Sequence, residues 1–138
     1  MMRDRTRETA VKEFHTLMGH QIGGPFSFSL KEVELRMKLI NEECAELSIE
    51  GNALSMEMMR DGRVKNETVI KFLKELADLQ YVISGCAVAL GLPLGLAFNR
   101  VHASNMSKMG VDGKPLLRGD GKVLKGSNYK EPQMEDLL

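Results

Sequence analysis

The stretch from about Ser29 to Met59 constrains the fold more than any other part of this 138-residue sequence. It opens with Ser29-Leu30-Lys31-Glu32, a capping-box pattern in which a hydroxyl begins the helix and a glutamate follows three residues later. No proline interrupts the stretch, and the single Gly51 costs only about 1 kcal/mol in a helix. The pattern therefore predicts one long helix, whose apolar side chains need cover from other elements.

Two faces of this helix carry apolar residues when the side chains are placed at about 100° per residue. One face mixes leucine with carboxylates, and its members are Leu35, Leu39, Glu42, Glu43, Glu46 and Ala53. The other face is mostly apolar, and its members are Met37, Ile40, Cys44, Leu47, Leu54 and Met58. We predict that the second face is buried between subunits of an oligomer.

Three further helices are predicted around the long one. Apolar residues at helical spacing indicate helices over about 6–18, 66–90 and 93–107, and Asn66-Glu67 is a suitable N-cap for the second of these. After Gly110 the periodicity ends, and glycine, proline and lysine dominate an irregular tail with room for one short hairpin. We predict an all-α fold of four to five helices in a single domain over 1–138, with a helical core at about 6–109 and a tail at about 110–138.

Composition excludes several classes of protein. Nineteen basic and nineteen acidic residues give a formal net charge of zero, which argues against a general nucleic-acid binder. No stretch approaches the roughly 18 apolar residues of a membrane span. Cys44 and Cys86 form no CxxC pair, so we predict that both are small buried residues in a reduced, cytoplasmic protein.

Acidic residues cluster on two adjacent predicted helices, as Glu42, Glu43 and Glu46 on the first and as Glu75 and Asp78 on the second. Carboxylates three or four residues apart share a helix face and repel one another unless a positive charge offsets them. Mg²⁺ prefers such oxygen ligands. The alternatives are a solvated acidic face, or a non-catalytic helical bundle that uses these acids for structure or ion binding.

These motifs resemble a known superfamily. Glu42-Glu43-Cys44-Ala45-Glu46-Leu47 followed by Glu75-Leu76-Ala77-Asp78-Leu79 is similar to the EExxE and ExxD signature of the all-α nucleoside triphosphate pyrophosphatases. That superfamily includes MazG-like proteins, phosphoribosyl-ATP pyrophosphohydrolases and dimeric dUTPases. The likeness continues through residues 101–108, 120–126 and 129–132, and it covers most of the chain from about Phe14 onward.

The resemblance implies a role for each matching acid. Glu43, Glu46, Glu75 and Asp78 would be ligands of Mg²⁺, with Mn²⁺ as an alternative, and Glu42 would orient or deprotonate the attacking water. The implied reaction is hydrolysis between the α- and β-phosphates of a nucleotide, which gives a nucleoside monophosphate and pyrophosphate.

The tail offers the positive charge that a triphosphate needs. Seven basic residues and two acids lie between Arg100 and Lys130. We predict substrate contacts for residues in or near this tail, namely Asn105, Lys108, Lys122, Lys125 and Tyr129. Phe14 and His15, near the end of the predicted helix over 6–18, resemble the part of the family that lines the base pocket, which implies contact with the nucleobase.

We therefore expect a Mg²⁺-dependent nucleoside triphosphate pyrophosphohydrolase of MazG-like type, acting as a homodimer or homotetramer. A deoxynucleoside triphosphate is the expected substrate, with dUTP or another pyrimidine nucleotide as the first choice. Phosphoribosyl-ATP hydrolysis and a non-catalytic metal-binding bundle are the alternatives. We expect no nucleic-acid or membrane partner.

Overall fold

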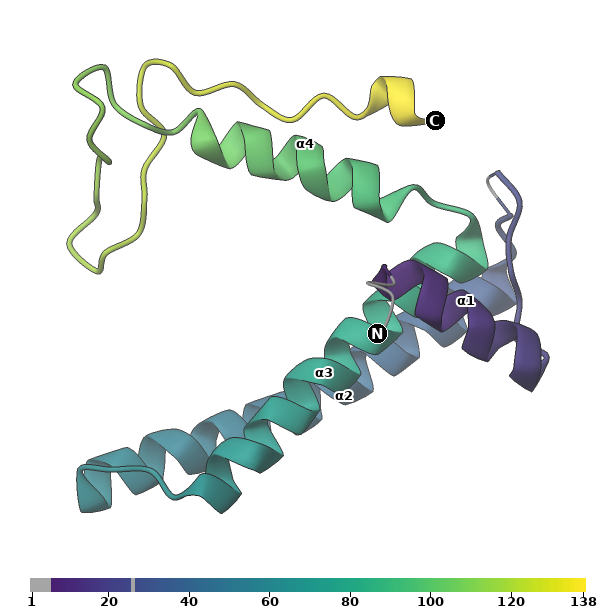
Figure 1. Ribbon diagram of the computed structural model, residues 1–138, viewed down its shortest axis with the longest axis horizontal. Helices are drawn as coiled ribbons and strands as arrows, with labels where there is room; N and C mark the ends of the chain where they lie inside the picture. The colour runs from purple at the N-terminus through teal and green to yellow at the C-terminus, as the bar shows by residue number, and fades with distance from the viewer. Residues whose placement is uncertain (1–5, 26) are drawn as a thin grey trace, which may run out of the picture. The chain divides into compact units, whose positions relative to one another are not determined.

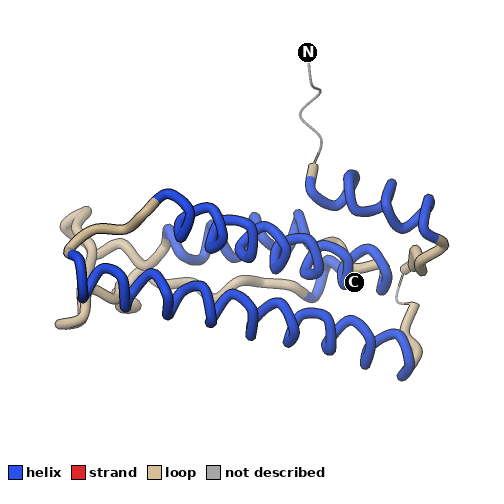
Figure 2. Tube along the Cα trace, turned by 90° about the horizontal axis from the view of Figure 1, so that it is seen from below, coloured by secondary structure: helices blue, strands red, loops and turns tan. Residues whose placement is uncertain are grey.

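The regular structure of the chain consists of helices. The computed structural model describes residues 6–25 and 27–138, and within these ranges it contains no strand (Figure 2). The elements are α1 Arg7–Met18, α2 Leu30–Asp61, α3 Asn66–Leu90, α4 Leu94–Met106 and the short 3-10 helix η1 Glu135–Leu137 (Figure 1). The all-α prediction is confirmed, and every predicted helix end lies within about two residues of the observed one.

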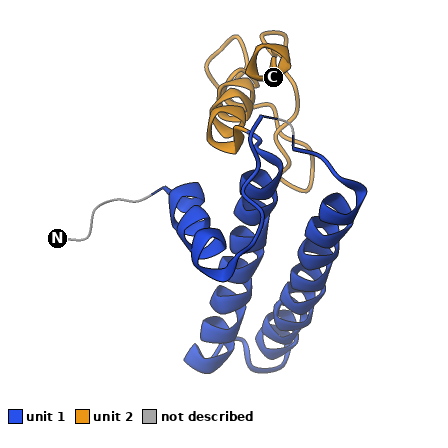
Figure 3. Cartoon of the chain, turned by 90° about the vertical axis from the view of Figure 1, so that its right-hand side faces the viewer, with its two compact units in different colours: residues 1–92 blue, residues 93–138 orange. Residues whose placement is uncertain are grey.

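The chain divides into two compact units, residues Met1–Leu92 and Pro93–Leu138 (Figure 3). In the first unit α2 and α3 lie side by side and run in opposite directions, and α1 packs against α3 (Figure 1). In the second unit the tail after α4 forms two isolated antiparallel bridges, Met109 with Pro115 and Leu117 with Val123. The prediction of a single domain over 1–138 stays a prediction.

Local signals explain where the long helices begin and end. The Ser29 hydroxyl accepts a hydrogen bond of 3.2 Å from the Glu32 N–H, as the capping-box pattern predicts. The Glu32 carboxylate does not complete the box and instead accepts a bond of 2.7 Å from Arg36 Nε. Gly62 ends α2 in the left-handed conformation at φ 67°, which glycine adopts without a Cβ clash.

The loop after α1 is fixed to the end of α3. Gly23 donates its N–H to the Val88 carbonyl at 3.0 Å, and the Gln21 side chain donates to the Ala89 carbonyl at 2.7 Å. A Cβ on Gly91 would lie 1.8 Å from the Gly24 carbonyl oxygen, so this approach requires glycine. The loop thereby satisfies carbonyls at the C-terminus of α3 that have no partner within the helix.

The buried face of α2 differs from both predicted faces. It runs along the helix as one stripe whose buried or half-buried members include Val33, Arg36, Leu39, Ile40, Glu43, Leu47, Glu50, Leu54 and Glu57. Leu35 and Glu42 of the first predicted face are exposed, and so are Met37 and Cys44 of the second. Within the single chain the stripe draws on both predicted faces and contains buried charged residues, which hydrophobic periodicity alone does not detect. Burial of the second face between subunits stays a prediction.

Two smaller expectations also fail. Cys44 is exposed rather than buried, and Cys86 is half-buried. Both cysteines are free thiols. The N-cap of α3 is Lys65, which makes no side-chain capping bond, and Asn66 is the first residue of the helix.

None of the described helices is by itself both long and apolar enough to cross a membrane. The neighbouring helices α3 and α4 meet that test only when they are counted together, on length and composition alone.

Candidate metal and nucleotide site

Three carboxylates from two helices converge in the first unit. Glu43 of α2 and Glu75 and Asp78 of α3 each place one oxygen so that the three oxygens lie within 4.8 Å of one another. Glu75 is 9% exposed, and Glu43 and Asp78 are half-buried. We call these three residues the acidic trio.

The helices explain why these three acids meet. Glu75 and Asp78 are three residues apart, so their side chains share one face of α3. Glu43 belongs to the buried stripe of α2, which packs along α3. The side chains therefore converge because the packing of the two helices places them there.

The trio carries unsatisfied hydrogen-bonding capacity. Glu43 Oε2 and Glu75 Oε2 are buried and have no hydrogen-bond partner within the described part of the chain. Burial raises the pKa of Glu43, and the nearby carboxylates of Glu46, Asp78 and Glu75 raise it further. Burying a carboxylate oxygen without a hydrogen-bond donor costs free energy unless a nearby cation offsets its negative charge.

A hard divalent cation fits this group of residues. The ligand atoms that the trio offers are carboxylate oxygens, which Mg²⁺ and Mn²⁺ prefer, and Glu43 and Glu75 each have one oxygen without a hydrogen-bond partner in the described part of the chain. The trio would supply three such ligands, and water or phosphate oxygens would complete the coordination.

Lys74 is the cation that the structure places beside the trio. Its Nζ lies 2.7 Å from Asp78 Oδ2 and 3.2 Å from Glu75 Oε1. The hydrogen bonds to Asp78 and then to Glu75 raise the pKa of Lys74. In the sequence this lysine suggests only ordinary surface pairing, and its spacing of four residues from Asp78 signals one of the two contacts but not the bridge to Glu75 as well.

The other two acids of the first motif lie outside the trio. Glu42 is exposed and approaches Lys38 Nζ at 4.0 Å. Glu46 is exposed as well, although it is close enough to raise the pKa of Glu43. Their roles as water-activating residue and fourth ligand stay predictions.

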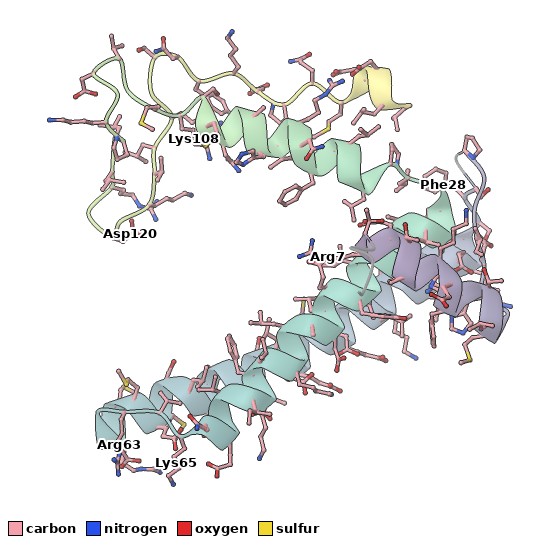
Figure 4. All side chains as sticks on the ribbon, viewed as in Figure 1. Arg7, Phe28, Arg63, Lys65, Lys108 and Asp120 are labelled. Carbon is pink, nitrogen blue, oxygen red and sulfur yellow. The ribbon has the colours of Figure 1, made fainter. Side chains whose placement is uncertain are left out.

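The predicted tail contacts lie in the second unit. Lys108 lies two residues after the end of α4, and its N–H donates to the Asn105 carbonyl at 3.2 Å (Figure 4). Lys125 Nζ lies 4.5 Å from the centre of the Tyr129 ring, a cation–π contact. Lys122 is exposed, and its backbone N–H donates to Asp120 at 3.2 Å.

Side chains of α4 hold the end of the tail. Arg100 donates to both carboxylate oxygens of Asp136, at 2.9 and 2.7 Å. The buried Ser104 hydroxyl donates to the Lys130 carbonyl at 2.7 Å. A cavity of about 640 Å³ lies in this unit, and Tyr129 and Lys130 are among the residues that line it.

The α1 candidates lie within a cluster of rings. His15 is only 2% exposed, and its Nδ1 donates to the Gln21 carbonyl at 2.8 Å. The half-buried Phe14 ring meets the Tyr81 ring edge to face at 5.6 Å. Both residues therefore make internal contacts, and nucleobase contact by either one stays a prediction.

Arg36, which is buried beside this cluster, was not identified from the sequence, although its spacing of four residues from Glu32 on one helix is a usable signal.

The comparison with protein families agrees with the motifs. Residues 11–105 match the family described as phosphoribosyl-ATP pyrophosphohydrolase. No curated protein matches the sequence. Among solved structures, the chain is similar to a protein of Exiguobacterium sp. 255-15 provisionally named an NTP pyrophosphohydrolase, with 24% identity, a TM-score of 0.44, and coverage of 94% of this chain and 90% of that one.

The family match spans well over half of the chain and includes both acidic motifs. It confirms the resemblance to the MazG-like all-α pyrophosphatases that the motifs predict. The chain is a pyrophosphohydrolase and belongs to the phosphoribosyl-ATP pyrophosphohydrolase family.

Proposed function

We propose that this protein hydrolyses the bond between the α- and β-phosphates of a nucleoside triphosphate and releases a nucleoside monophosphate and pyrophosphate. The observation that carries the proposal is the acidic trio, with its two buried and unpartnered carboxylate oxygens. Such oxygens suit a divalent cation that also binds phosphate.

The trio of Glu43, Glu75 and Asp78 would hold Mg²⁺, with Mn²⁺ as an alternative, and Glu46 would be the fourth ligand. When bound, the cation neutralises charge on the phosphates and lowers the pKa of a bound water. Glu42 would orient the attacking water and take its proton, a role that suits an exposed carboxylate next to Glu43 in the sequence.

Groups in the tail and in α1 would bind the rest of the substrate. Asn105, Lys108, Lys122 and Lys125 supply amide and ammonium donors for phosphate or sugar oxygens. The Tyr129 ring, which Lys125 already contacts, offers a stacking surface for a base. Phe14 and His15 are the α1 candidates for contact with the nucleobase.

There are two candidate substrates. A deoxynucleoside triphosphate, with dUTP or another pyrimidine nucleotide first, is the substrate that the MazG-like tail pattern suggests. The family match favours phosphoribosyl-ATP as the second candidate. Both substrates require the same cleavage between α- and β-phosphates, so the acidic trio serves either one.

The test is pyrophosphate release from a panel of deoxynucleoside triphosphates and phosphoribosyl-ATP, with Mg²⁺, with Mn²⁺ and with EDTA. We expect metal-dependent release from one substrate class and a loss of about 100-fold or more in Glu75→Gln. Glu67→Gln is the matched control, since Glu67 is an exposed acid in the first turn of the same helix. Release that is indifferent to both metal and Glu75 would remove the enzymatic role of the trio. Metal binding with no release from any substrate would favour the non-catalytic bundle.

We also propose a homodimer or homotetramer in the cytoplasm. Large apolar side chains on α2 and α3 are exposed in the single chain, among them Ile49 at 65%, Met59 at 80% and Leu73 at 62%. Apolar surface of this kind is commonly covered by a second subunit. Sedimentation equilibrium tests the proposal, and a monomer at micromolar concentration would contradict it.

The proposed cytoplasmic location rests on the two cysteines, whose free thiols suit a reducing compartment.

A further inference from the structure

Lys74 contacts two of the three trio carboxylates at once. Its ammonium bonds Asp78 Oδ2 at 2.7 Å and Glu75 Oε1 at 3.2 Å, while Glu75 Oε2 has no partner. No other ion pair found in residues 6–25 and 27–138 involves a member of the trio. The three carboxylates thus share one nearby positive charge, which comes from the chain itself.

The charges around this ammonium explain its effect. Glu43, Glu75 and Asp78 repel one another at separations below 5 Å, and Glu46 adds a further negative charge nearby. An ammonium that bonds two of them reduces this repulsion while no metal is bound. Since the Lys74 side chain is 62% exposed, it can leave the acids without opening the core.

We propose that Lys74 is a built-in counter-ion of the acidic trio, which stabilises the metal-free protein and competes with the divalent cation for the same carboxylates. This inference rests on the proposed metal site. The ammonium carries one charge and a Mg²⁺ or Mn²⁺ ion carries two, so the divalent ion wins at sufficient concentration but binds more weakly than it would to the acids alone. Lys74 therefore sets the metal concentration at which the site fills.

Lys74→Gln, Lys74→Arg and a matched control separate the effect of this contact from a general change in charge. Lys71→Gln is the control, because Lys71 is an exposed lysine on the same helix, four residues before Glu75 in the sequence, and makes no ion pair among the described residues. Lys74→Arg keeps the positive charge beside the acids.

Two readouts that do not depend on activity follow for each variant. In EDTA, we expect the thermal midpoint of Lys74→Gln to fall by about 2–5 °C, with Lys74→Arg and Lys71→Gln close to wild type. In a titration with Mn²⁺ alone, we expect Lys74→Gln to bind about three- to tenfold more tightly than wild type, and Lys71→Gln to change less than twofold.

Weaker or unchanged Mn²⁺ affinity in Lys74→Gln would overturn the inference, and so would an unchanged midpoint in EDTA. The same titration keeps the two proposals apart. If wild type binds Mn²⁺ and Glu75→Gln does not, the metal site stands whatever Lys74→Gln shows. If wild type binds no Mn²⁺, the metal site and the competition proposed for Lys74 both fail.

Discussion

The carboxylate of Glu57 accepts a hydrogen bond of 3.3 Å from the backbone N–H of Lys65, across the turn that joins α2 to α3. Figure 4 marks this turn with the side chains of Arg63 and Lys65. Glu57 is buried, and a hydrogen bond from the Thr68 side chain is the main cause of its lowered pKa. Because Lys65 makes no capping bond of its own, a residue of α2 stabilises the first turn of α3.

Glu57→Gln should therefore lower the thermal midpoint. The amide keeps the size of the side chain but loses the charge that both donors favour, and we expect a fall of about 3–6 °C. Glu34→Gln is the control, since Glu34 is an exposed acid on the same helix, and it should change the midpoint by less than about 1 °C. Equal midpoints for the two variants would contradict the capping role.

The same residue predicts a pH dependence with a definite sign. The pKa of Glu57 is lowered below its ordinary value of 4.5, so the folded protein favours the charged form. Its contribution to stability is complete above about pH 4.5 and is lost as the pH falls through the lowered pKa. The difference in unfolding free energy between wild type and Glu57→Gln should therefore shrink on acidification, which urea titrations at several pH values can measure. A difference that grows toward acid pH would contradict the prediction.

The boundaries of the helices could be predicted because each signal is local. Ser29 begins α2 through its own hydroxyl, and Gly62 and Gly91 end α2 and α3 in left-handed conformations. The buried face of α2 could not be predicted, because it depends on what packs against it. Arg36 and Glu57 are buried through partners on α2 and α3, and nothing in a hydrophobicity pattern distinguishes them from exposed charges.

The candidate site shows the same division. The motif spacing predicted that acids of two helices would meet, and Glu43, Glu75 and Asp78 do lie together. Spacing alone did not indicate that Glu43, rather than Glu42 or Glu46, faces α3, since all three lie within five residues and the rotation of α2 decides among them. The spacing of four residues between Lys74 and Asp78 signals one contact, but the additional bond to Glu75 depends on side-chain conformations, which sequence patterns do not encode.

His15 gives a second pH-dependent prediction, in which the folded protein favours the neutral form of the side chain rather than the charged form. Burial is the largest cause that lowers the pKa of His15 below its ordinary value of 6.5, and the nearby charges of Arg36 and His20 lower it further. The folded protein therefore favours the neutral ring. Stability is fully present above about pH 6.5 and falls as the pH drops from there toward the lowered pKa.

Thermal midpoints of wild type and His15→Gln between about pH 8 and about pH 5 test this prediction. Wild type should lose more stability over this range, because Gln keeps an N–H donor for the Gln21 carbonyl but takes up no proton. His102→Gln, at an exposed position on α4, is the control and should keep the wild-type slope. A His15→Gln slope equal to that of wild type would show that His15 does not cause the loss.

Substitution of Glu42 and of Glu46 should change different properties, kcat for Glu42 and Mn²⁺ affinity for Glu46, although both are exposed acids one turn apart on α2. If Glu42 takes the proton of the attacking water, Glu42→Gln should lower kcat by about 10²- to 10⁴-fold and leave Mn²⁺ affinity nearly unchanged. If Glu46 is the fourth ligand, Glu46→Gln should weaken Mn²⁺ binding by about tenfold or more. Each variant is the control for the other, and matching losses in both assays would remove the distinction between a base and a ligand.

Ser104 provides a test of how the tail is held. The residue is 7% exposed and its hydroxyl donates to the Lys130 carbonyl at 2.7 Å, so Ser104→Ala leaves that carbonyl with only the longer bond of 3.4 Å from Ser107. Loss of such a bond costs about 1 kcal/mol, which corresponds to roughly fivefold more frequent local opening. Limited trypsin digestion should therefore cleave the tail about fivefold faster, as mass spectrometry can measure. Ser127→Ala, at an exposed position in the same tail, should digest at the wild-type rate. Equal cleavage rates for Ser104→Ala and wild type would mean that other contacts, such as the pair of Arg100 with Asp136, hold the tail unaided.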